Sequence, residues 1–273
     1  MNIACLFPSN VGCGYCMADG VPIVLRRMGH RVMEYRNPRI ADGPCEFPGF
    51  DLVLVLVPEA IDSKIYASAK PPIALWICET TGREDFDFGP GYDFLTKLTP
   101  YCFFPSASDA EHYGCTFLPF GVDTEVFQPM PEIKRDVAVG FLGQLYAKRR
   151  VFLGKLEEAG IHVEVLPRVE WDSDPKVWGE NLVLAYNRID LFVSLPSLSL
   201  LTVCKVYEAM ACGCVVAEMH GEEDIEGLKR IIAWGREHRD EAGMQARMSA
   251  VKYYKLEYRL QKILDTVAAG DKK

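Results

Sequence analysis

The sequence predicts an α/β protein made of two consecutive doubly wound blocks. Short apolar runs of strand length alternate with helical patterns in both halves of the chain. A segment at residues 119–135, rich in proline and charge and without periodicity, separates the two halves and reads as a linker. Near-continuous apolar runs such as LVLVLV are typical of parallel strands that are covered on both faces. We therefore expect two Rossmann-like domains that face each other across a central cleft, where ligands of such sheets bind.

The elements of each block follow from hydrophobic periodicity and turn residues. In the first block, strands are expected at residues 2–7, 31–35, 51–57, 72–78, 101–104 and 116–118, and helices at 18–28, 60–69, 92–98 and 107–113. In the second block, strands are expected at residues 136–142, 162–166, 191–195 and 214–218, and helices at 148–159, 176–185, 202–212 and 225–237. A long helical region is expected over residues 241–268.

Composition restricts the class of protein. The net charge of −8 argues against a large basic surface for nucleic acid. No apolar run approaches the roughly 18 residues of a membrane span, and the chain opens directly with a strand, so we expect a cytoplasmic protein. The ten cysteines are spread through expected strands and helices, as in a reduced protein. Cys13 and Cys16 form a CxxC without a second such pair, so a metal or redox role is the less favoured reading.

The helix expected at residues 202–212 carries the most informative pattern. Val206 and Tyr207 belong to an apolar stripe, whereas Lys205 and Glu208 are three residues apart on a different face. A helix that starts just after a strand offers free N–H groups to an anion. Lys205 and Glu208 could then hold a phosphate and a sugar diol. Taken alone, an ordinary surface ion pair is the default interpretation of these two residues.

A second anion-friendly strand end opens the second block. The strand that ends near Gly140 leads through Gly143 to Lys148 and Arg149 at a helix start. Gly143 would let backbone N–H groups approach a phosphate, and Arg149 would neutralise it. A plain glycine turn before a solvated basic helix is the alternative. Two such strand ends in one domain suit a diphosphate.

Three other acidic residues, Glu79, Asp172 and Asp174, are candidates for catalysis or metal binding. Glu79 follows the strand expected at residues 72–78, where it could orient or deprotonate an acceptor hydroxyl, although a solvated charged loop fits as well. Asp172 and Asp174 resemble a metal-binding DxD. Because Pro175 follows directly, Asp174 is better read as a helix N-cap, and no dedicated metal site is expected.

Three segments together resemble group 1 glycosyltransferases of the GT-B fold. Gly121-Val122-Asp123 with the later Phe127-Gln128-Pro129 is similar to their interdomain signature. Val139–Gly143 followed by Arg149 resembles their first phosphate loop, and Glu208-Ala209-Met210-Ala211-Cys212-Gly213 resembles the end of their donor-binding helix. The resemblance covers about residues 117–218, and the first domain matches only in its strand–helix rhythm.

The resemblance implies a GT-B-like enzyme that moves a sugar from a nucleoside-diphosphate sugar to an acceptor hydroxyl, usually with retention and without a metal or other cofactor. Glu208 would contact the donor ribose, and Arg149 and Lys205 would face the diphosphate. Lys205 would thereby stabilise the leaving group, with Glu79 as the second candidate catalytic residue. Backbone N–H groups around Ser197, Ser199 and Thr202 would also contact the diphosphate.

The resemblance also implies a division of the chain. Residues 1–121 would form the acceptor-side domain, residues 122–250 the donor-binding domain, and residues 251–273 a helix that packs back on the first domain. The acceptor could be a glycan, a lipid-linked sugar, a protein or a modified nucleobase.

One position departs from the family pattern. Many members carry a second glutamate eight residues before the helix glutamate, where this chain has Leu200. A branch resembling spore-maturation glycosyltransferases also lacks it and has a basic residue in the place of Lys205. A sugar-nucleotide epimerase or phosphorylase on the same fold, and a catalytically silent sugar-nucleotide-binding protein, are the alternative functions.

Overall fold

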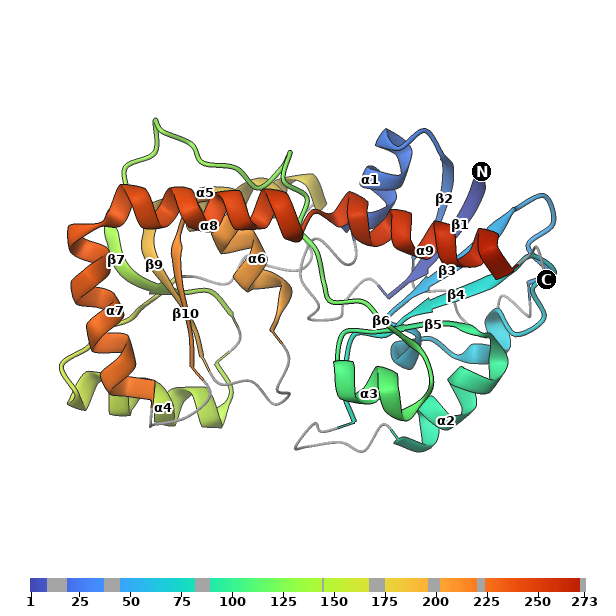
Figure 1. The fold of residues 1–273 in the computed structure, drawn as a ribbon, viewed down its shortest axis with the longest axis horizontal. Helices are drawn as coiled ribbons and strands as arrows, with labels where there is room; N and C mark the ends of the chain where they lie inside the picture. Colours follow the sequence, from blue (N-terminus) through green and yellow to red (C-terminus); the bar gives the residue numbers. More distant parts are fainter. Residues whose placement is uncertain are drawn as a thin grey trace. The chain divides into compact units, whose positions relative to one another are not determined.

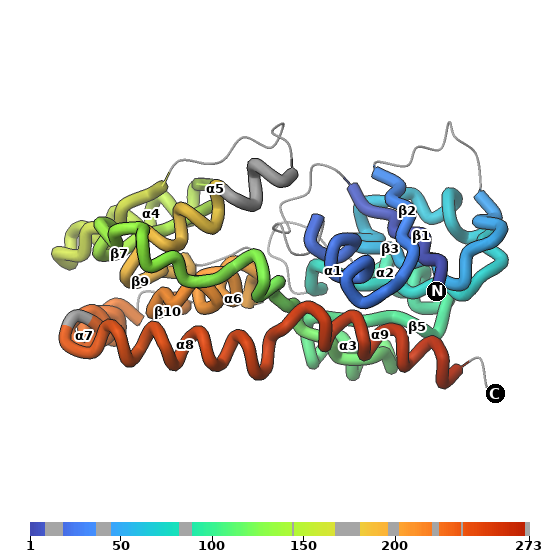
Figure 2. Tube along the Cα trace, turned by 90° about the horizontal axis from the view of Figure 1, so that it is seen from above, coloured from blue at the N-terminus to red at the C-terminus, as the bar shows by residue number. Residues whose placement is uncertain are grey.

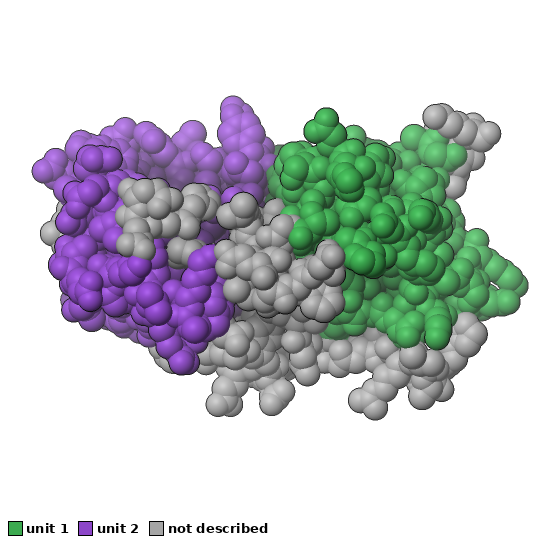
Figure 3. Space-filling view, turned by 90° about the horizontal axis from the view of Figure 1, so that it is seen from below, with its two compact units in different colours: residues 1–121, 198–201, 256–273 green, residues 122–197, 202–255 purple. Residues whose placement is uncertain are grey.

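The protein is described here by a computed structural model. It describes residues 1–8, 19–36, 45–81, 89–143, 145–166, 175–195, 202–219 and 224–270, without the side chains of residues 175–180 and 236. The chain divides into two compact units, which are coloured separately in Figure 3. Unit 1 takes Met1–Gly121 and Leu256–Lys273, and unit 2 takes Val122–Ser197 and Thr202–Lys255.

Unit 1 is built on a parallel sheet of six described strands in the order β2-β1-β3-β4-β5-β6. The strands are β1 (Asn2–Phe7), β2 (Arg31–Arg36), β3 (Leu52–Leu56), β4 (Ile73–Trp76), β5 (Tyr101–Phe104) and β6 (Thr116–Phe117). All residues of β3 and β4 are buried, as expected for parallel strands covered on both faces.

Four helices cover the two faces of this sheet (Figure 1). α1 (Val21–Arg27) and α9 (Leu256–Gly270) lie against one face, and α2 (Gly89–Leu98) and α3 (Ala107–His112) lie against the other. α9 buries the stripe Leu256, Leu260, Ile263, Leu264 and Val267, which has the spacing of an amphipathic helix. The ion pair of Arg27 with Glu257, at 3.0 Å, joins α1 to the start of α9.

Unit 2 contains a parallel sheet of four described strands in the order β10-β9-β7-β8. These strands are β7 (Val137–Phe141), β8 (Glu164–Val165), β9 (Ile189–Ser194) and β10 (Val215–Glu218). Its helices are α4 (Ala147–Glu158), α5 (Pro175–Arg188), α6 (Cys204–Ala211), α7 (Ile225–Glu237) and α8 (Arg239–Tyr253). α4 and α7 contribute Phe152, Leu156 and Leu228 to the apolar core on one face. α6 lies beside α8 on the other face (Figures 1 and 2).

This architecture confirms the predicted α/β class with doubly wound parallel sheets, and most predicted elements occur within a few residues of their expected bounds. α5 begins at Pro175, as the proline at a first helical position predicted. α6 ends at Ala211, and Gly213 follows with a φ of 79°, which confirms the expected glycine stop.

The prediction of a helix at residues 60–69 is wrong. The structure has two short 3₁₀ turns instead, Pro58–Ala60 and Ser63–Ile65. The Asp62 side chain accepts a hydrogen bond from the Lys64 N–H and starts the second turn. The Ile65 carbonyl accepts from the Cys45 N–H, and Lys70 donates to the Glu46 carbonyl. Backbone hydrogen bonds to residues distant in sequence therefore accompany short turns here, where a continuous helix was expected.

The long helical region predicted at residues 241–268 is two helices, α8 and α9. The break falls at Tyr254 and Lys255, whereas the last helix was expected to begin at residue 251. Val122 donates its N–H to the Tyr254 carbonyl at 2.8 Å and forms a parallel bridge with Lys255. The break therefore depends on a tertiary contact, because the local sequence has no glycine or proline to signal it. Within the described ranges, no helix has the length and apolar character needed to cross a membrane.

Candidate functional site

The connectivity of unit 2 marks one edge of its sheet as the candidate site. From β7 the chain moves to β8 on one side, and it then returns to β9 and β10 on the other side. β7 and β9 are therefore the neighbouring strands at which the direction of winding reverses. Ligands of open α/β sheets bind outside the carboxyl ends of the strands at such a switch point. Gly143 follows β7 and α6 follows β9, so the structure brings the two predicted anion-binding segments to this point.

Gly143 and Lys205 lie close together at this edge. A Cβ atom placed on Gly143 would lie 3.1 Å from Lys205 Nζ and 2.7 Å from the Phe141 ring. Real Cβ atoms essentially never approach other heavy atoms within 3 Å, so a side chain at this position would displace the ring. A glycine here allows the lysine ammonium group to lie against the backbone of the strand-end loop.

Arg149 in the first turn of α4 packs against the same aromatic residue. Its guanidinium group lies over the Phe141 ring at 5.2 Å and over the Tyr146 ring at 4.5 Å from their centroids. Cation–π contacts of this kind fix a planar cation without neutralising it. Burial lowers the pKa of Arg149, because removing the charge from water costs free energy. Arg149 and Lys205 thus supply two positive charges next to Phe141 and Gly143.

The start of α6 adds backbone donors to this edge. Val203 stands at the N-cap in an extended conformation and makes no side-chain cap hydrogen bond, so the cap position itself offers no serine, threonine or aspartate oxygen. Thr202, just before it, donates its hydroxyl to Glu218 at the end of β10, at 3.3 Å. This contact joins the segment between β9 and α6 to the carboxyl end of β10.

Glu208 lies deeper in the same helix. Its side chain is 0% exposed, and Tyr186 of α5 donates its hydroxyl to Glu208 Oε2 at 3.0 Å. Burial and the neighbouring carboxylate both raise the pKa of Tyr186, so the phenol keeps its proton and remains a donor. Glu208 is therefore held inside unit 2 and is not a solvated partner of a surface ion pair.

The residues of the interdomain signature have a structural role in this protein. Asp123 is 0% exposed, and its carboxylate accepts from the Glu125 N–H at 3.1 Å. Arg247 of α8 donates to the carbonyl oxygens of Thr124, Phe127 and Ala211. The guanidinium group thereby ties this segment to the end of α6 within unit 2.

Unit 1 offers a different kind of edge, beyond the carboxyl end of β4. Asp109 of α3 accepts hydrogen bonds from the hydroxyl groups of Thr80 and Thr81, each at 2.5 Å, and from the Thr81 N–H at 3.2 Å. Asp109 is 5% exposed. It holds the loop that carries the half-buried Glu79, the candidate acceptor residue.

The sequence analysis missed Glu59, which lies beside this loop. Its Oε1 atom accepts a hydrogen bond from the Cys78 N–H at 2.9 Å, directly before Glu79. Burial raises the pKa of Glu59 from 4.5 to about 7, although backbone hydrogen bonds oppose the shift. The signal that could have found it is its place just after the apolar strand LVLVL.

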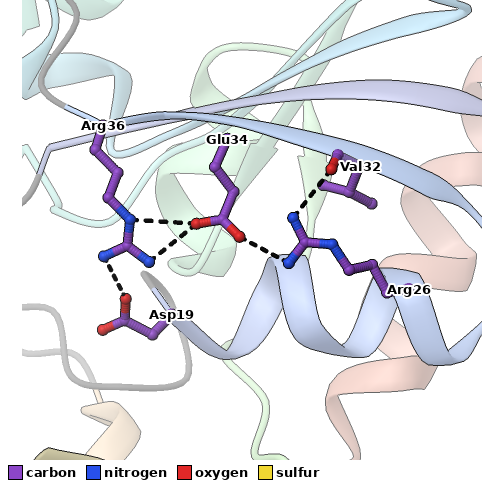
Figure 4. Close-up of polar contacts among 5 residues, drawn as sticks. All are labelled: Asp19, Arg26, Val32, Glu34 and Arg36. Atoms are coloured by element: carbon purple, nitrogen blue, oxygen red, sulfur yellow. Dashed lines mark hydrogen bonds and ion pairs between the residues drawn. The ribbon is translucent and has the colours of Figure 1, made fainter. Parts of the chain in front are cut away.

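At the outer strands of unit 1, alternating charges connect α1 to β2 (Figure 4). Arg26 donates to the Glu34 carboxylate and to the Val32 carbonyl, while Arg36 contacts both Glu34 and Asp19. Burial alone would raise the pKa of Glu34, but hydrogen bonds from Arg26 and Arg36 outweigh it and lower the pKa. These opposite charges satisfy one another, so the cluster fastens the helix to the strand.

Several predicted residues lie outside the described part of the chain. These are Ser197, Ser199 and Leu200 before α6, Asp172 and Asp174 before α5, and the Cys13–Cys16 pair. Among the residues that the structure describes, no group of three or more histidine, cysteine, aspartate or glutamate side chains could hold a metal ion.

The chain is similar to solved glycosyltransferase structures over nearly its whole length. The Anabaena protein HepE, in complex with UDP and glucose, superposes with a TM-score of 0.67 at 14% identity, covering 98% of this chain and 100% of that one. AviGT4, a glycosyltransferase of avilamycin A biosynthesis, gives a TM-score of 0.65 at 12% identity, covering 98% and 97%. A glycosyltransferase from Rickettsia africae gives 0.63 at 12% identity, covering 97% of each chain.

No protein-family model matches the sequence, and no curated protein is significantly similar to it. At such low identity, the structural likeness establishes the fold. The protein has the GT-B fold of these glycosyltransferases, as its sequence predicted.

Proposed function

We propose that the protein is a glycosyltransferase that moves a sugar from a nucleoside-diphosphate sugar to an acceptor hydroxyl. The observation that carries the proposal is the meeting of Gly143 with Lys205 at the switch point of unit 2, with Arg149 against the same Phe141 ring. A strand-end glycine, an uncapped helix start and two cations match the needs of a diphosphate. HepE, of the same fold, has been solved with UDP-glucose, so UDP-sugars are the first donors to test.

The chemistry that this edge would perform is stabilisation of the leaving group. In the transfer, the bond between the sugar anomeric carbon and the diphosphate oxygen breaks, and a bond to the acceptor oxygen forms. Negative charge develops on the departing nucleoside diphosphate. Lys205, Arg149 and the N–H groups at the start of α6 would stabilise this charge without a metal ion. Ser197, Ser199 and Thr202 precede that helix and belong to the same proposed contact.

Glu208 is proposed to accept a hydrogen bond from the donor ribose, as the family resemblance implies. It lies three residues after Lys205 on α6, and Tyr186 fixes the orientation of its carboxylate. The donor would have to reach a side chain that is buried in the present structure. Glu208 therefore supports unit 2 in addition to its proposed contact with the ribose.

Unit 1 is proposed to supply acceptor activation. Glu79 would orient the acceptor hydroxyl and take its proton as the new glycosidic bond forms. The acceptor class remains a glycan, a lipid-linked sugar, a protein or a modified nucleobase, and the transfer is proposed to retain the anomeric configuration.

A donor panel tests this function. Purified protein is incubated with UDP-, GDP- and dTDP-sugars, and binding and release of the nucleoside diphosphate are both measured. We expect one base to be preferred, with release of its diphosphate, and we expect Arg149→Gln to weaken donor binding while the exposed Arg230→Gln does not. Failure to bind any donor contradicts the proposal. Binding without turnover, across donors and acceptors, would favour a catalytically silent sugar-nucleotide-binding protein instead.

A further inference from the structure

Glu59 lies at the switch point of unit 1, the counterpart of the edge described in unit 2. The chain leaves β1 for β2 on one side and returns to β3 on the other, so β1 and β3 are the neighbours at which winding reverses. Glu59 follows the carboxyl end of β3 in the 3₁₀ turn Pro58–Ala60. Glu59 therefore lies at the kind of strand end where open α/β sheets bind their ligands.

The backbone before Glu59 is held in an unfavourable conformation. Val57 has φ 55° and ψ 52°, the left-handed region that a β-branched residue rarely adopts. The strand-like hydrogen bond from the Val57 N–H to the Trp76 carbonyl, at 3.1 Å, keeps it there. The conformation turns the chain sharply after β3, so that the Glu59 side chain reaches the loop after β4. Such outliers cost free energy and persist only where the surrounding structure over-determines them.

The carboxyl group of Glu59 contacts the backbone of the Glu79 loop. Oε1 accepts from the Cys78 N–H at 2.9 Å, and the N–H groups of Glu59 itself and of Glu79 also favour its ionised form. Oε2 is buried and has no hydrogen-bond partner among the described residues. The carboxyl group is thus too deeply placed to touch an acceptor, but it contacts the segment that presents Glu79.

The Glu79 loop is held from two sides. Asp109 binds Thr80 and Thr81 beyond Glu79, and Glu59 binds Cys78 before it. We propose that Glu59 is a positioning residue, whose ionised carboxylate holds the Cys78–Thr81 loop and thereby sets where Glu79 meets the acceptor hydroxyl. This inference rests on the proposed function, because it concerns the acceptor side of that reaction.

The groups that face Glu59 explain why its charge state matters. Glu79, from the loop after β4, raises the pKa of Glu59, and burial raises it more. Tyr66, after the second 3₁₀ turn, and Tyr92, on α2, are both close enough to Glu59 for its charge to raise their pKa values. Both phenols therefore remain neutral near pH 7. The carboxylate is a stronger acceptor for the Cys78 N–H than the neutral acid, so this contact strengthens once Glu59 has lost its proton, even though burial of the charge lowers the stability of the folded protein as a whole.

The pH dependence of transfer tests the proposal. With a pKa of about 7, the ionised fraction of Glu59 rises about tenfold between pH 6 and pH 8, so kcat/KM of the wild type should rise by up to that factor. Glu59→Gln retains an amide oxygen for Cys78 but cannot ionise, so its profile should change less than twofold across this range. The exposed Glu111→Gln, on α3, should keep the wild-type rise. If Glu59→Gln keeps the full rise, the assignment is wrong.

Hydrogen exchange of the loop separates this inference from the proposed function, since it requires no activity. Wild type and Glu59→Gln are compared at the same pH for the backbone N–H groups of Cys78 and Glu79. At pH 8, these amides should exchange several-fold more slowly in the wild type, and at pH 5 the difference should nearly vanish. Equal exchange at both pH values overturns the positioning role even if the enzyme transfers sugar. If the protein transfers no sugar but the exchange rates of wild type and Glu59→Gln differ at pH 8 as expected, Glu59 still holds the loop. That result would reject the proposed reaction and keep the positioning role.

Discussion

The two units present opposite chemistry at the same place in the fold. At the switch point of unit 2, Lys205 and Arg149 lie around Gly143 and an uncapped helix start. At the corresponding edge of unit 1, Glu59 and Asp109 hold the loop that carries Glu79. Both edges lie at the carboxyl ends of parallel strands, and they differ in the side chains that follow those strands. The same kind of sheet thus carries a basic edge in unit 2 and an acidic edge in unit 1.

The two edges also differ in how they are stabilised. Lys205 lies against a glycine backbone, and Arg149 lies over an aromatic ring. The acidic edge contains a carboxyl group that titrates near neutrality because it is buried. We therefore expect the pH response of this protein at its acidic edge.

The largest expected effect is on the stability of the acidic edge. Since the pKa of Glu59 is raised from 4.5 to about 7 in the folded state, its contribution to stability is fully present below pH 4.5 and is lost as pH rises through 7. At 1.36 kcal/mol per unit, the loss is at most about 3 kcal/mol. The free energy of unfolding is measured by urea denaturation for the wild type and for Glu59→Gln. As the pH rises from 5 to 8, the wild type should lose stability relative to Glu59→Gln. A constant difference across this range would contradict the burial argument.

The next largest effect concerns the basic edge. Lys205→Gln removes one cation from the proposed diphosphate contact and should weaken donor binding about 100-fold, equivalent to about 2.7 kcal/mol. Titration calorimetry with the preferred donor measures this, and the exposed Lys134→Gln in the same unit is the matched control. Equal weakening in both variants would point to general electrostatic attraction and not to a site at Lys205.

A smaller effect is expected one turn further along α6. Glu208→Ala should lower donor affinity at least tenfold, about 1.4 kcal/mol, through loss of a charged hydrogen bond to the ribose. Because Glu208 is fully buried, the variant must first be shown to be folded. Tyr186→Phe is the control, since it removes the hydroxyl that binds Glu208 and keeps the carboxylate. Unchanged donor affinity in a folded Glu208→Ala protein would sink the ribose assignment.

The smallest expected effect is that of metal removal. If the two cations of unit 2 carry the charge of the leaving group, EDTA should leave activity unchanged. The rate is measured with and without EDTA and after addition of Mg²⁺. Strict dependence on Mg²⁺ would return attention to Asp172 and Asp174.

Local pattern was enough to predict most of the fold. Strands such as β1, β5 and β10 have strongly apolar runs of strand length, and their bounds agree closely with prediction. Gly143, Lys205 and Glu208 were singled out from spacing and family resemblance, and the structure brings the first two together. Glycine and proline signals at Gly213 and Pro175 marked helix ends correctly, because their backbone preferences are local.

What local pattern could not predict depends on contacts between distant residues. The break at Tyr254 arises from pairing with Val122, and the missing helix near Ile65 arises from pairing with Cys45. The burial of Glu208 against Tyr186 is also a tertiary fact, since its helical spacing alone suggested an exposed position.

The sequence by itself determined that this is a doubly wound α/β protein with anion-friendly strand ends in its second half, because apolar periodicity and strand-end glycines act over a few residues. Only the tertiary structure decided that Gly143 and Lys205 meet at one switch point and that the Glu59 carboxyl group contacts the Glu79 loop. The physical reason is that burial and proximity depend on which strands become neighbours. That order is set when the whole sheet forms.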